Sequence, residues 1–364
     1  MAASSASFLA QRLPRWWYGR GIAPALLPLA PLSWVFRSVV AARRRRFLAD
    51  PATAGRLPVP VIVVGNLTVG GSGKTPVVLW LVERLRAAGW RPGVISRGYG
   101  AASDGPRAAQ ADDAAASGDE PALLARRSGA PVFVGRDRVA AGEALLQAHP
   151  DCNLIIADDG LQHYRLQRDV EIAVFDSRGA GNGHLLPLGP LREPLTRLAG
   201  CTAVVWNGAP ESGAARAAAG LPQFAMRLQG ASFRSLVDPA QRCGGEAFAG
   251  KRLYALAGIG DPQRFFRHLE ALGLRFSARP FADHHAYCPD DLAFASDGVL
   301  LMTEKDAVKC ASFYAPSGGA PAAQTLPGLP EAWALPVDAD IAAAPGSPGL
   351  LDLILEKLNG RTPA

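Results

Sequence analysis

The fold is decided by the stretch Thr68-Val69-Gly70-Gly71-Ser72-Gly73-Lys74-Thr75, which follows the apolar run Val59–Val64 and precedes a helix-compatible segment, Pro76–Ala88. A strand, a glycine-rich turn and a helix N-terminus in this order bind nucleotide phosphates. Glycines let backbone N–H groups turn toward the anion, and the helix dipole adds favourable charge. All eight residues of the turn are therefore predicted to bind a nucleoside triphosphate, with Lys74 at the β/γ-phosphates and the Thr75 hydroxyl on Mg²⁺. The alternative is an ordinary glycine-rich turn before a helix.

The turn departs from the general P-loop pattern at one position. The pattern G-x-x-x-x-G-K-[ST] has glycine where this chain has Thr68. We expect the pair Gly70-Gly71 to supply the backbone flexibility instead.

The body of the chain alternates apolar runs with helical patterns. Runs such as Leu154–Ala157 and Ile172–Phe175 are separated by patterns such as Thr75–Ala88 and Asp137–Ala148. This alternation predicts an α/β fold with a mostly parallel, P-loop NTPase-like sheet. The ligand site is then expected at the carboxyl ends of the strands.

Length and composition predict more than one domain. The chain has 364 residues, and a segment rich in Gly, Ala, Pro and Ser over 208–221 is expected to be a linker. We therefore expect three parts: a helical N-terminal segment over 1–56, a P-loop domain over 57–210, and a second, smaller α/β domain over 211–364 that closes the cleft.

Charge is concentrated at the N-terminal end of the chain. Residues 1–56 hold nine arginines and one acid, Asp50, a net charge of +8, so the total of +6 leaves −2 for the remaining residues. The body is therefore not a basic nucleic-acid binder, and no nucleic-acid partner is expected. The five cysteines contain no Cys-x-x-Cys pair, which is typical of reduced cytoplasmic thiols and not of a zinc site.

The N-terminal segment contains an apolar stretch, Gly21–Val40, that approaches membrane-spanning length. Three prolines and the internal Arg37 disfavour a straight transmembrane helix, and no small-residue cleavage site indicates a signal peptide. Tryptophans such as Trp34 beside the run Arg43–Arg46 favour a helix lying in a membrane interface, with its arginines attracted to anionic lipid. The alternative is a helix packed on the protein's own core.

Two acids follow a hydrophobic strand and form a candidate metal site. Asp158 and Asp159 come directly after Leu154–Ala157, and Gly160-Leu161-Gln162-His163 follows. An acid at the end of a strand near a P-loop is where Mg²⁺ is held, directly or through water. The alternative is a turn closed by Asp-Gly.

A third acid, Asp119, lies in the motif Gly118-Asp119-Glu120-Pro121, before a helical pattern. It suits an N-cap, with Pro121 in the first helical turn. In the other interpretation it faces the strand-end crevice and accepts the proton of a substrate hydroxyl.

Two further motifs supply candidate basic groups. Arg192 follows a glycine-rich and then Leu/Pro-rich segment, where it would stabilise charge on a transferring phosphoryl group. His284 and His285 follow Asp283, but neighbouring side chains of a strand point to opposite faces, so a metal site is not expected there. A histidine that is ordered by an acid and assists a catalytic carboxylate is at least as consistent with the pattern.

These motifs together resemble those of the tetraacyldisaccharide 4′-kinase family, ATP-dependent enzymes of lipid A biosynthesis. The resemblance follows the family order over most of the chain, and the combination is more specific than the P-loop alone. Thr68 suits the Asn-x-Thr-x-Gly-Gly opening of this family. The matching stretches are Val64–Pro76, Ile95–Gly100, Gly118–Pro121, Asp158–His163, Leu191–Pro194, Asp283–His285 and Thr303–Asp306.

The resemblance implies transfer of the ATP γ-phosphate to the 4′-hydroxyl of a tetraacylated glucosamine disaccharide 1-phosphate. It also implies two α/β lobes around a cleft, and a peripheral or monotopic position on the cytoplasmic face of the inner membrane. By motif position, Asp119 resembles the catalytic carboxylate, His284 its partner and Arg192 the phosphate-stabilising arginine. In the same way Asp158 and Asp159 resemble the acids of the Mg²⁺ site.

A competing class is a membrane-associated P-loop switch or transport ATPase without lipid kinase activity. A GTPase would carry [NT]-K-x-D, whereas Thr303-Glu304-Lys305-Asp306 has its lysine one position late. A non-catalytic scaffold agrees poorly with the intact Lys74, Thr75 and Asp158. The sequence leaves open the oligomeric state, the acyl-chain preference, the adenine contacts and the number of Mg²⁺ ions.

Overall fold

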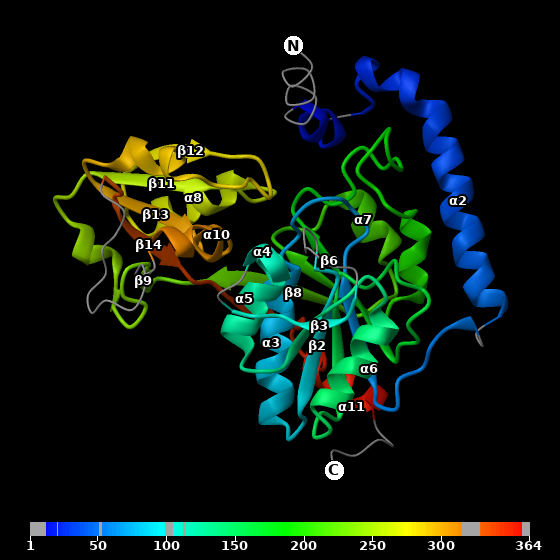
Figure 1. Ribbon diagram of the computed structural model, residues 1–364. Helices are drawn as coiled ribbons and strands as arrows, with labels where there is room; N and C mark the ends of the chain where they lie inside the picture. The colour runs from blue at the N-terminus through cyan, green and yellow to red at the C-terminus, as the bar shows by residue number, and fades with distance from the viewer. Residues whose placement is uncertain are drawn as a thin grey trace.

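The computed structural model describes residues 12–19, 21–50, 53–98, 105–111, 114–314 and 328–358. It contains two α/β domains, each built on its own sheet, and a long N-terminal helix beside the larger domain (Figure 1). This is the fold class predicted from the sequence. Tyr99 and Gly100 of the Ile95–Gly100 motif lie outside the described residues.

The larger domain is built on a nine-stranded sheet in the order β15-β8-β7-β6-β1-β5-β2-β4-β3. The strands from β8 to β4 run parallel, and only the edge strands β15 and β3 are antiparallel to their neighbours. The strands are β1 (Val61–Gly65), β2 (Pro92–Ser96), β3 (Arg107–Ala108), β4 (Val132–Val134), β5 (Leu154–Asp158), β6 (Val170–Asp176), β7 (Ala203–Asn207), β8 (Gln223–Gln229) and β15 (Asp338–Ala342).

Strand β1 illustrates why both faces of this sheet are covered. Val61 and Val63 belong to one core cluster, with residues of α6, whereas Ile62 and Val64 belong to another, with residues of α3. A continuous apolar run, with no polar face, is what a parallel strand between two helical layers requires. The α-helices of this domain are α3 (Lys74–Ala87), α4 (Ala114–Ser117), α5 (Asp119–Ser128), α6 (Arg138–Ala148), α7 (Ser212–Ala217) and α11 (Leu350–Leu358).

The expected linker over 208–221 contains helix α7 instead. Its composition is typical of a loop, but the Glu211 side chain accepts hydrogen bonds from the backbone N–H groups of Gly213 and Ala214. This N-terminal cap supports a short helix that propensity alone does not predict.

The smaller domain is built on a six-stranded sheet in the order β10-β9-β14-β13-β11-β12. Its central strands β14, β13, β11 and β12 run parallel, so their carboxyl ends also meet at one edge. The elements are β9 (Phe233–Ser235), β10 (Arg242–Cys243), β11 (Leu253–Ala257), α8 (Pro262–Ala271), β12 (Ser277–Pro280), α9 (Pro289–Leu292), β13 (Val299–Thr303), α10 (Glu304–Tyr314) and β14 (Glu331–Leu335).

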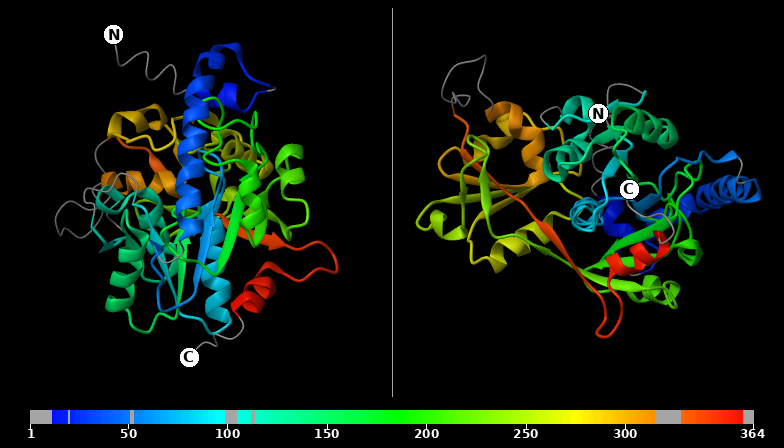
Figure 2. Two further views of the ribbon diagram at one scale, coloured as in Figure 1. Left: turned by 90° about the vertical axis from the view of Figure 1, so that its right-hand side faces the viewer. Right: turned by 90° about the horizontal axis from the view of Figure 1, so that it is seen from below.

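The smaller domain is inserted into the larger one. The chain leaves the first sheet after β8, builds the second sheet, and returns along β14 to β15, which pairs with β8 (Figure 2). The two segments that connect the domains are in close contact, because a Cβ on Gly230 would lie 2.2 Å from the Pro336 carbonyl oxygen. β8, β15 and α11 therefore belong to the first domain, although the composition assigned 211–364 to the second.

The N-terminal segment forms a short 3-10 helix, Pro24–Leu29, followed by α2 (Ala30–Ala49). The prolines do not interrupt α2, because Pro31 stands in its first turn, where no intrahelical N–H is needed. Pro24–Ala49 is long and apolar enough to cross a membrane, and 11% of its apolar 18-residue window is buried. Trp34 is 68% exposed.

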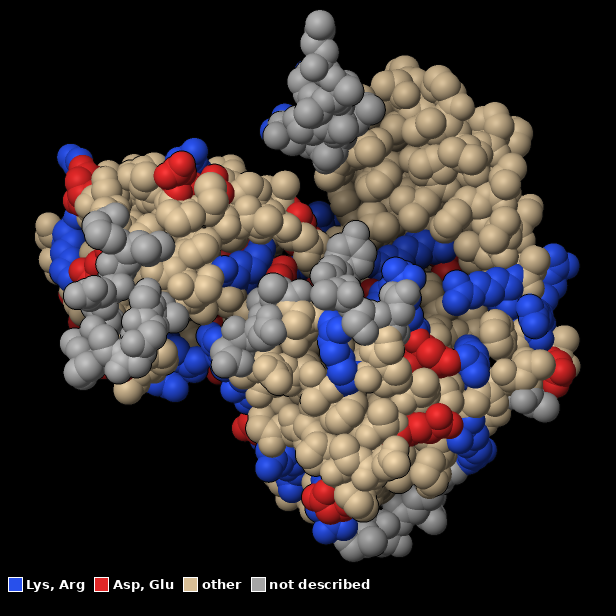
Figure 3. All heavy atoms as spheres, viewed as in Figure 1, with Lys and Arg blue, Asp and Glu red and all other residues tan. Residues whose placement is uncertain are grey.

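One side of α2 nevertheless contacts the body. The Ser33 hydroxyl donates a hydrogen bond to the Leu185 carbonyl at 2.9 Å, and Phe36 packs on the core of the first domain. In Figure 3 the surface over the upper part of α2 is free of Lys and Arg, and blue spheres gather toward its lower end. The structure thus combines both interpretations of this segment: one side packs on the protein, and the other carries exposed apolar side chains.

Candidate active site

The glycine-rich loop 68–75 connects β1 to α3. Gly70 and Gly73 both have a φ of +95°, in the region that favours glycine. Gly73 is the N-cap of α3, and Lys74 is its first residue. The loop therefore presents a helix N-terminus at the carboxyl end of a parallel strand, as a phosphate site requires.

Thr68 occupies the position that is glycine in the general P-loop pattern, and its backbone pairing explains why a threonine is tolerated there. It is buried and forms an isolated antiparallel bridge with Leu191, while the Arg192 N–H donates to the Leu67 carbonyl at 2.7 Å. Backbone in such a bridge needs no left-handed conformation, so a threonine is accommodated. The same pairing holds Arg192 beside the glycine-rich loop.

Lys74 is buried at the head of α3. It is 7% exposed, its Nζ lies 3.5 Å from Asp159 Oδ1, and it donates to Asn66 Oδ1 at 3.4 Å. A buried ammonium group is stable only with such partners. Its charge therefore lies between the acids that follow β5 and the glycine-rich loop.

Asp158, the last residue of β5, is completely buried. The Ser96 hydroxyl donates to its Oδ2 at 3.3 Å, and its Oδ1 has no hydrogen-bond partner among the residues that the structure describes. Burial, with the charge of Glu120, raises the pKa of Asp158 to about 7. Its negative charge is therefore disfavoured in this buried position unless a cation compensates it.

Asp159 faces the cavity and is held by Arg192. The Arg192 Nη1 donates to Oδ1 and Oδ2 of Asp159 at 3.1 and 3.0 Å, and to Gln162 Oε1 at 3.3 Å. Burial favours a raised pKa for Asp159, but the charges of Lys74 and Arg192 outweigh it and hold the pKa below its usual range. The structure thus brings Lys74 and Arg192 together around one ionised acid.

Asp119 and His284 meet across the two domains. The Asp119 Oδ2 lies 3.5 Å from His284 Nδ1 and 3.8 Å from Lys309 Nζ. Burial favours a raised pKa for Asp119, but the hydrogen bond of His284 and the charges of Lys309 and Lys305 lower it overall. The N-cap interpretation of Asp119 is wrong, because Gly118 is the N-cap and Asp119 is the first residue of α5.

A second contact between the domains was not predicted from the sequence. Lys305 Nζ lies 3.0 Å from Glu120 Oε1 of the first domain and 3.3 Å from Asp283 Oδ1 of the second. Burial disfavours the charged lysine, but these two acids raise its pKa well above the usual value. The sequence placed Lys305 in the motif Thr303–Asp306 but assigned it no role; its place two residues after β13 was the available signal for a site residue.

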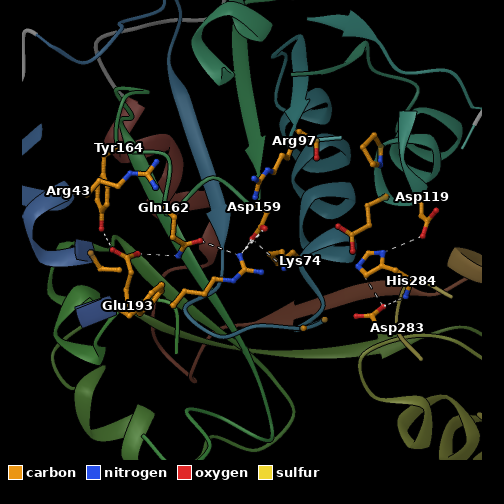
Figure 4. Close-up of a pocket in the computed structure, with 18 of the residues that line it drawn as sticks. Arg43, Lys74, Arg97, Asp119, Asp159, Gln162, Tyr164, Glu193, Asp283 and His284 are labelled. Carbon is orange, nitrogen blue, oxygen red and sulfur yellow. Dashed lines mark hydrogen bonds and ion pairs between the residues drawn. The ribbon is translucent and has the colours of Figure 1, made fainter. Parts of the chain in front are cut away.

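A cavity of about 580 Å³ lies between the domains, and its lining includes Lys74, Asp119, Glu120, Asp159, Arg192, Asp283 and His284 (Figure 4). In Figure 4 Lys74 and Asp159 lie at the centre, and Asp119 with His284 lies to one side. The sequence did not predict that α2 would add apolar side chains to the wall. The α2 residues are Phe36, Val39, Val40 and Arg43.

Thr75 and Asp158 do not line this cavity. Asp158 is completely buried, and Thr75 lines a second cavity of about 170 Å³ between the glycine-rich loop and the smaller domain. Gly71, Lys74 and Glu120 line both cavities, so the two adjoin at the loop.

His285 does not join the site. Its Nε2 lies 2.9 Å from Asp291 Oδ2, and its ring packs on Phe281 and Tyr287. In the described part of the chain, no three His, Cys, Asp or Glu residues form a group that could hold a metal ion by themselves.

Comparisons with known proteins agree with this geometry. The family model described as tetraacyldisaccharide-1-P 4′-kinase matches residues 25–359. The tetraacyldisaccharide 4′-kinase of Dechloromonas aromatica is 53% identical over 97% of this chain and 99% of its own length, and that of Azoarcus is 52% identical over 96% and 97%.

A solved structure extends the likeness to the fold. The crystal structure of LpxK from Aquifex aeolicus, described as a complex with ATP, has a TM-score of 0.71 and 26% identity, covering 92% of this chain and 99% of that one. The prediction of an ATP-dependent phosphotransferase of lipid A biosynthesis is therefore confirmed, and the alternative of a P-loop switch or transport ATPase is without support. The chain belongs to the tetraacyldisaccharide 4′-kinase family.

Proposed function

We propose that the acceptor of the reaction, a tetraacylated glucosamine disaccharide 1-phosphate, occupies the main cavity with its sugars toward Asp119 and its acyl chains toward α2. The proposal rests on the lining of the main cavity, which has both an apolar and a polar part. Phe36 and Val39 line it on the α2 side, and Lys74 and Asp119 belong to its polar part. A lipid with a sugar head group needs both kinds of surface in one site.

ATP occupies the adjoining space in this proposal. The glycine-rich loop 68–75 holds its phosphates, with the γ-phosphate toward the main cavity. The base and ribose take the second cavity, whose wall includes the apolar Leu79, Ile259 and Phe265. This arrangement is supported by Gly71 and Lys74, which line both cavities and so lie where the two substrates meet.

Each polar residue then has a role in phosphoryl transfer. Asp119 accepts the proton of the 4′-hydroxyl as that oxygen bonds to the γ-phosphorus, and His284 orients Asp119. Lys74 and Arg192 stabilise the negative charge on the transferred group as its bond to the ADP oxygen breaks. Both side chains form ion pairs with Asp159 in the structure, so two cationic groups are already held where phosphate oxygens would lie.

The residues also fit a Mg²⁺ ion, which we propose is held by Asp158, Asp159 and Thr75. Asp158 offers a buried carboxylate oxygen without a hydrogen-bond partner among the described residues, the kind of atom that a cation would satisfy. Mg²⁺ is usually held by one or two carboxylates together with substrate phosphates, so a preformed three-acid group is not needed. When bound, the ion would neutralise charge on the phosphates.

The acceptor requirement tests this function directly. ATP hydrolysis or transfer by the purified chain is measured with and without the disaccharide lipid in mixed micelles. We expect ADP to be released only with the acceptor, in a one-to-one ratio with phosphorylated lipid. Release of ADP at the same rate without acceptor would contradict the assignment.

Replacing His284 with alanine should change the pH dependence of the reaction as well as its rate. Asp119 works as a base only when ionised, so activity is lost as the pH falls through its pKa. His284 contributes to lowering that pKa, so its removal should raise it. We expect the acid limb of kcat/KM to move to higher pH in His284→Ala, with kcat falling less than in an Asp119 variant. An unchanged acid limb would mean that His284 does not act through Asp119.

We propose that the N-terminal segment places the enzyme on the cytoplasmic face of the inner membrane. An apolar helix with exposed Leu27, Trp34 and Val35 supports membrane association. Arginines at its C-terminal end would add attraction to anionic lipid, about 1 kcal/mol for each charge near the surface. A lipid-bearing surface is also where the acceptor is found, and α2 forms part of the acceptor cavity.

Two matched variants should separate the parts of this membrane binding. Replacing Arg44, Arg45 and Arg46 with serine leaves Arg43 in the cavity wall, and should make vesicle binding weaker and less salt-dependent. Replacing Leu27 and Trp34 with serine removes apolar insertion into the bilayer, which salt does not screen.

Deleting residues 1–46 should abolish vesicle binding and raise the KM for the lipid acceptor. The measurement is co-sedimentation with anionic vesicles across a salt series; equal binding by every variant would mean that the segment is only structural.

A further inference from the structure

Four consecutive carbonyl oxygens of the glycine-rich loop, those of residues 69–72, each accept a hydrogen bond from a side chain. The four donors come from different parts of the chain, and one belongs to the N-terminal segment. The pairs are Tyr18 with Val69 at 3.3 Å, Asn66 with Gly70 at 3.1 Å, Arg178 with Gly71 at 3.1 Å and Asn207 with Ser72 at 3.0 Å.

These hydrogen bonds set the direction of the loop's N–H groups. In a planar trans peptide, the carbonyl of one residue and the N–H of the next point in opposite directions. A donor that holds the carbonyl on one side therefore turns the following N–H to the other side. The four donors in this way orient the N–H groups of residues 70–73, which are the groups that a phosphate would meet.

Tyr18 links this arrangement to the N-terminal segment. Its ring centroid lies 4.6 Å from the guanidinium of Arg178, so the two donors also contact each other. Burial raises the pKa of Tyr18, and the hydroxyl therefore keeps its proton and remains a donor at neutral pH. Trp17 provides a second anchor nearby, since its Nε1 donates to the Pro187 carbonyl at 3.0 Å.

Arg178 links the same loop to the smaller domain. Its Nη1 donates to the Gly260 carbonyl at 3.0 Å, while its Nε donates to Asp176 Oδ2 at 3.0 Å. The two loops nearly touch, because a Cβ on Gly260 would lie 2.7 Å from the Gly71 nitrogen. One guanidinium group thus contacts the glycine-rich loop, the β11–α8 loop and Tyr18.

We propose that Tyr18 and Arg178 are positioning residues for the nucleotide phosphates: they hold the carbonyls of residues 69 and 71 outward, so that ATP affinity depends on the N-terminal segment. The inference rests on the proposed role of loop 68–75 in phosphate binding. It assigns the N-terminal segment an effect on ATP, separate from its effect on the lipid.

The first test compares Tyr18→Phe with Trp17→Phe in the full-length chain. Each substitution removes one hydrogen bond between the same segment and a loop, but only Tyr18 contacts the glycine-rich loop. We expect Tyr18→Phe to raise the Kd for ATP by about 2- to 10-fold, the effect of one neutral hydrogen bond, and Trp17→Phe to leave it unchanged. The Kd is measured by calorimetry without vesicles, so that membrane binding does not enter.

The second test uses Arg178→Lys, which keeps the charge but loses the forked donor that reaches Gly71 and Gly260 together. It should raise the KM for ATP while the KM for the lipid acceptor stays the same. The effects of Arg178→Lys and Tyr18→Phe should not add in the double variant, because both act on one loop. The triple serine variant of α2 should bind ATP normally, whereas deletion of residues 1–46 should weaken ATP binding.

Two results would overturn the inference. One is a wild-type Kd for ATP in Tyr18→Phe. The other is an equal loss in Trp17→Phe, which would show that general loosening of the segment is responsible. A wild-type Kd in Lys74→Ala would instead reject the loop 68–75 as the phosphate site, and the proposed function with it.

Discussion

Replacing Lys74 with alanine should abolish phosphoryl transfer while the protein remains folded. Lys74 carries its charge at the head of α3, 3.5 Å from Asp159, and no other lysine lines the main cavity among the described residues. Removing one preorganised donor to transition-state charge typically costs about 10²–10³-fold in kcat, and here the same group also holds the ground-state phosphates. We therefore expect a loss at or beyond the upper end of that range, together with weaker ATP binding.

The control for Lys74→Ala is Lys251→Ala, which removes a lysine from an exposed ion pair with Glu331, 3.2 Å away. That variant should keep wild-type activity. We expect Lys74→Ala to remain folded, because Asp159 keeps Arg192 as a partner. Thermal unfolding of both variants measures this. Near wild-type activity of folded Lys74→Ala would reject the assignment of loop 68–75.

Replacing Asp119 with asparagine should lower kcat by about 10²–10⁴-fold, the contribution of a general base, with little change in the KM for ATP. The side chain keeps its size and can still contact His284 and Lys309, but it can no longer accept a proton. Asp119 is the first residue of α5, where its charge gains about 0.3–1 kcal/mol from the helix dipole. Its neighbour Lys309 keeps a second acidic partner, Asp306, at 3.2 Å when the charge of Asp119 is removed. Stability should therefore change little while turnover collapses.

Asp291→Asn is the matched control for this variant. Asp291 also pairs with a histidine, His285, at 2.9 Å, but neither residue lines the main cavity. We expect Asp291→Asn to retain wild-type kcat. If Asp119→Asn retained it as well, the base would have to be another acid of the cavity wall, such as Glu120, Asp159 or Asp283.

The parts of the site that could be predicted are those in which local sequence determines geometry. Gly70 to Thr75 between an apolar run and a helix predicts a phosphate loop, because the strand, turn and dipole are all local features. Asp158 and Asp159 were predicted for the same reason, since parallel strands end at one edge. The predicted strands and helices near these motifs agree with β1, α3, α6 and β5 to within two residues or so at each end, the usual scatter of boundaries.

The parts that could not be predicted depend on distant segments. Lys305 meets Glu120 only because the smaller domain docks against α5, and no periodicity encodes that docking. The contribution of Phe36 to the cavity and of Tyr18 to the glycine-rich loop likewise requires the N-terminal segment to fold back on the body. The place of Asp119 in its helix could not be predicted either, because a first helical residue and an N-cap have the same sequence signature.

The return of the chain to the first sheet has a consequence for its synthesis. β15 and α11 are translated after the second sheet, which is built from a continuous earlier segment. Until β15 arrives, β8 is an open sheet edge, and until α11 arrives its Leu350 and Ile354 do not cover the core around α3. The smaller domain can therefore fold during translation, while the ATP-binding domain is incomplete until β15 and α11 have been translated. A stop codon placed after the second sheet would disable that domain although every residue of its glycine-rich loop had been translated.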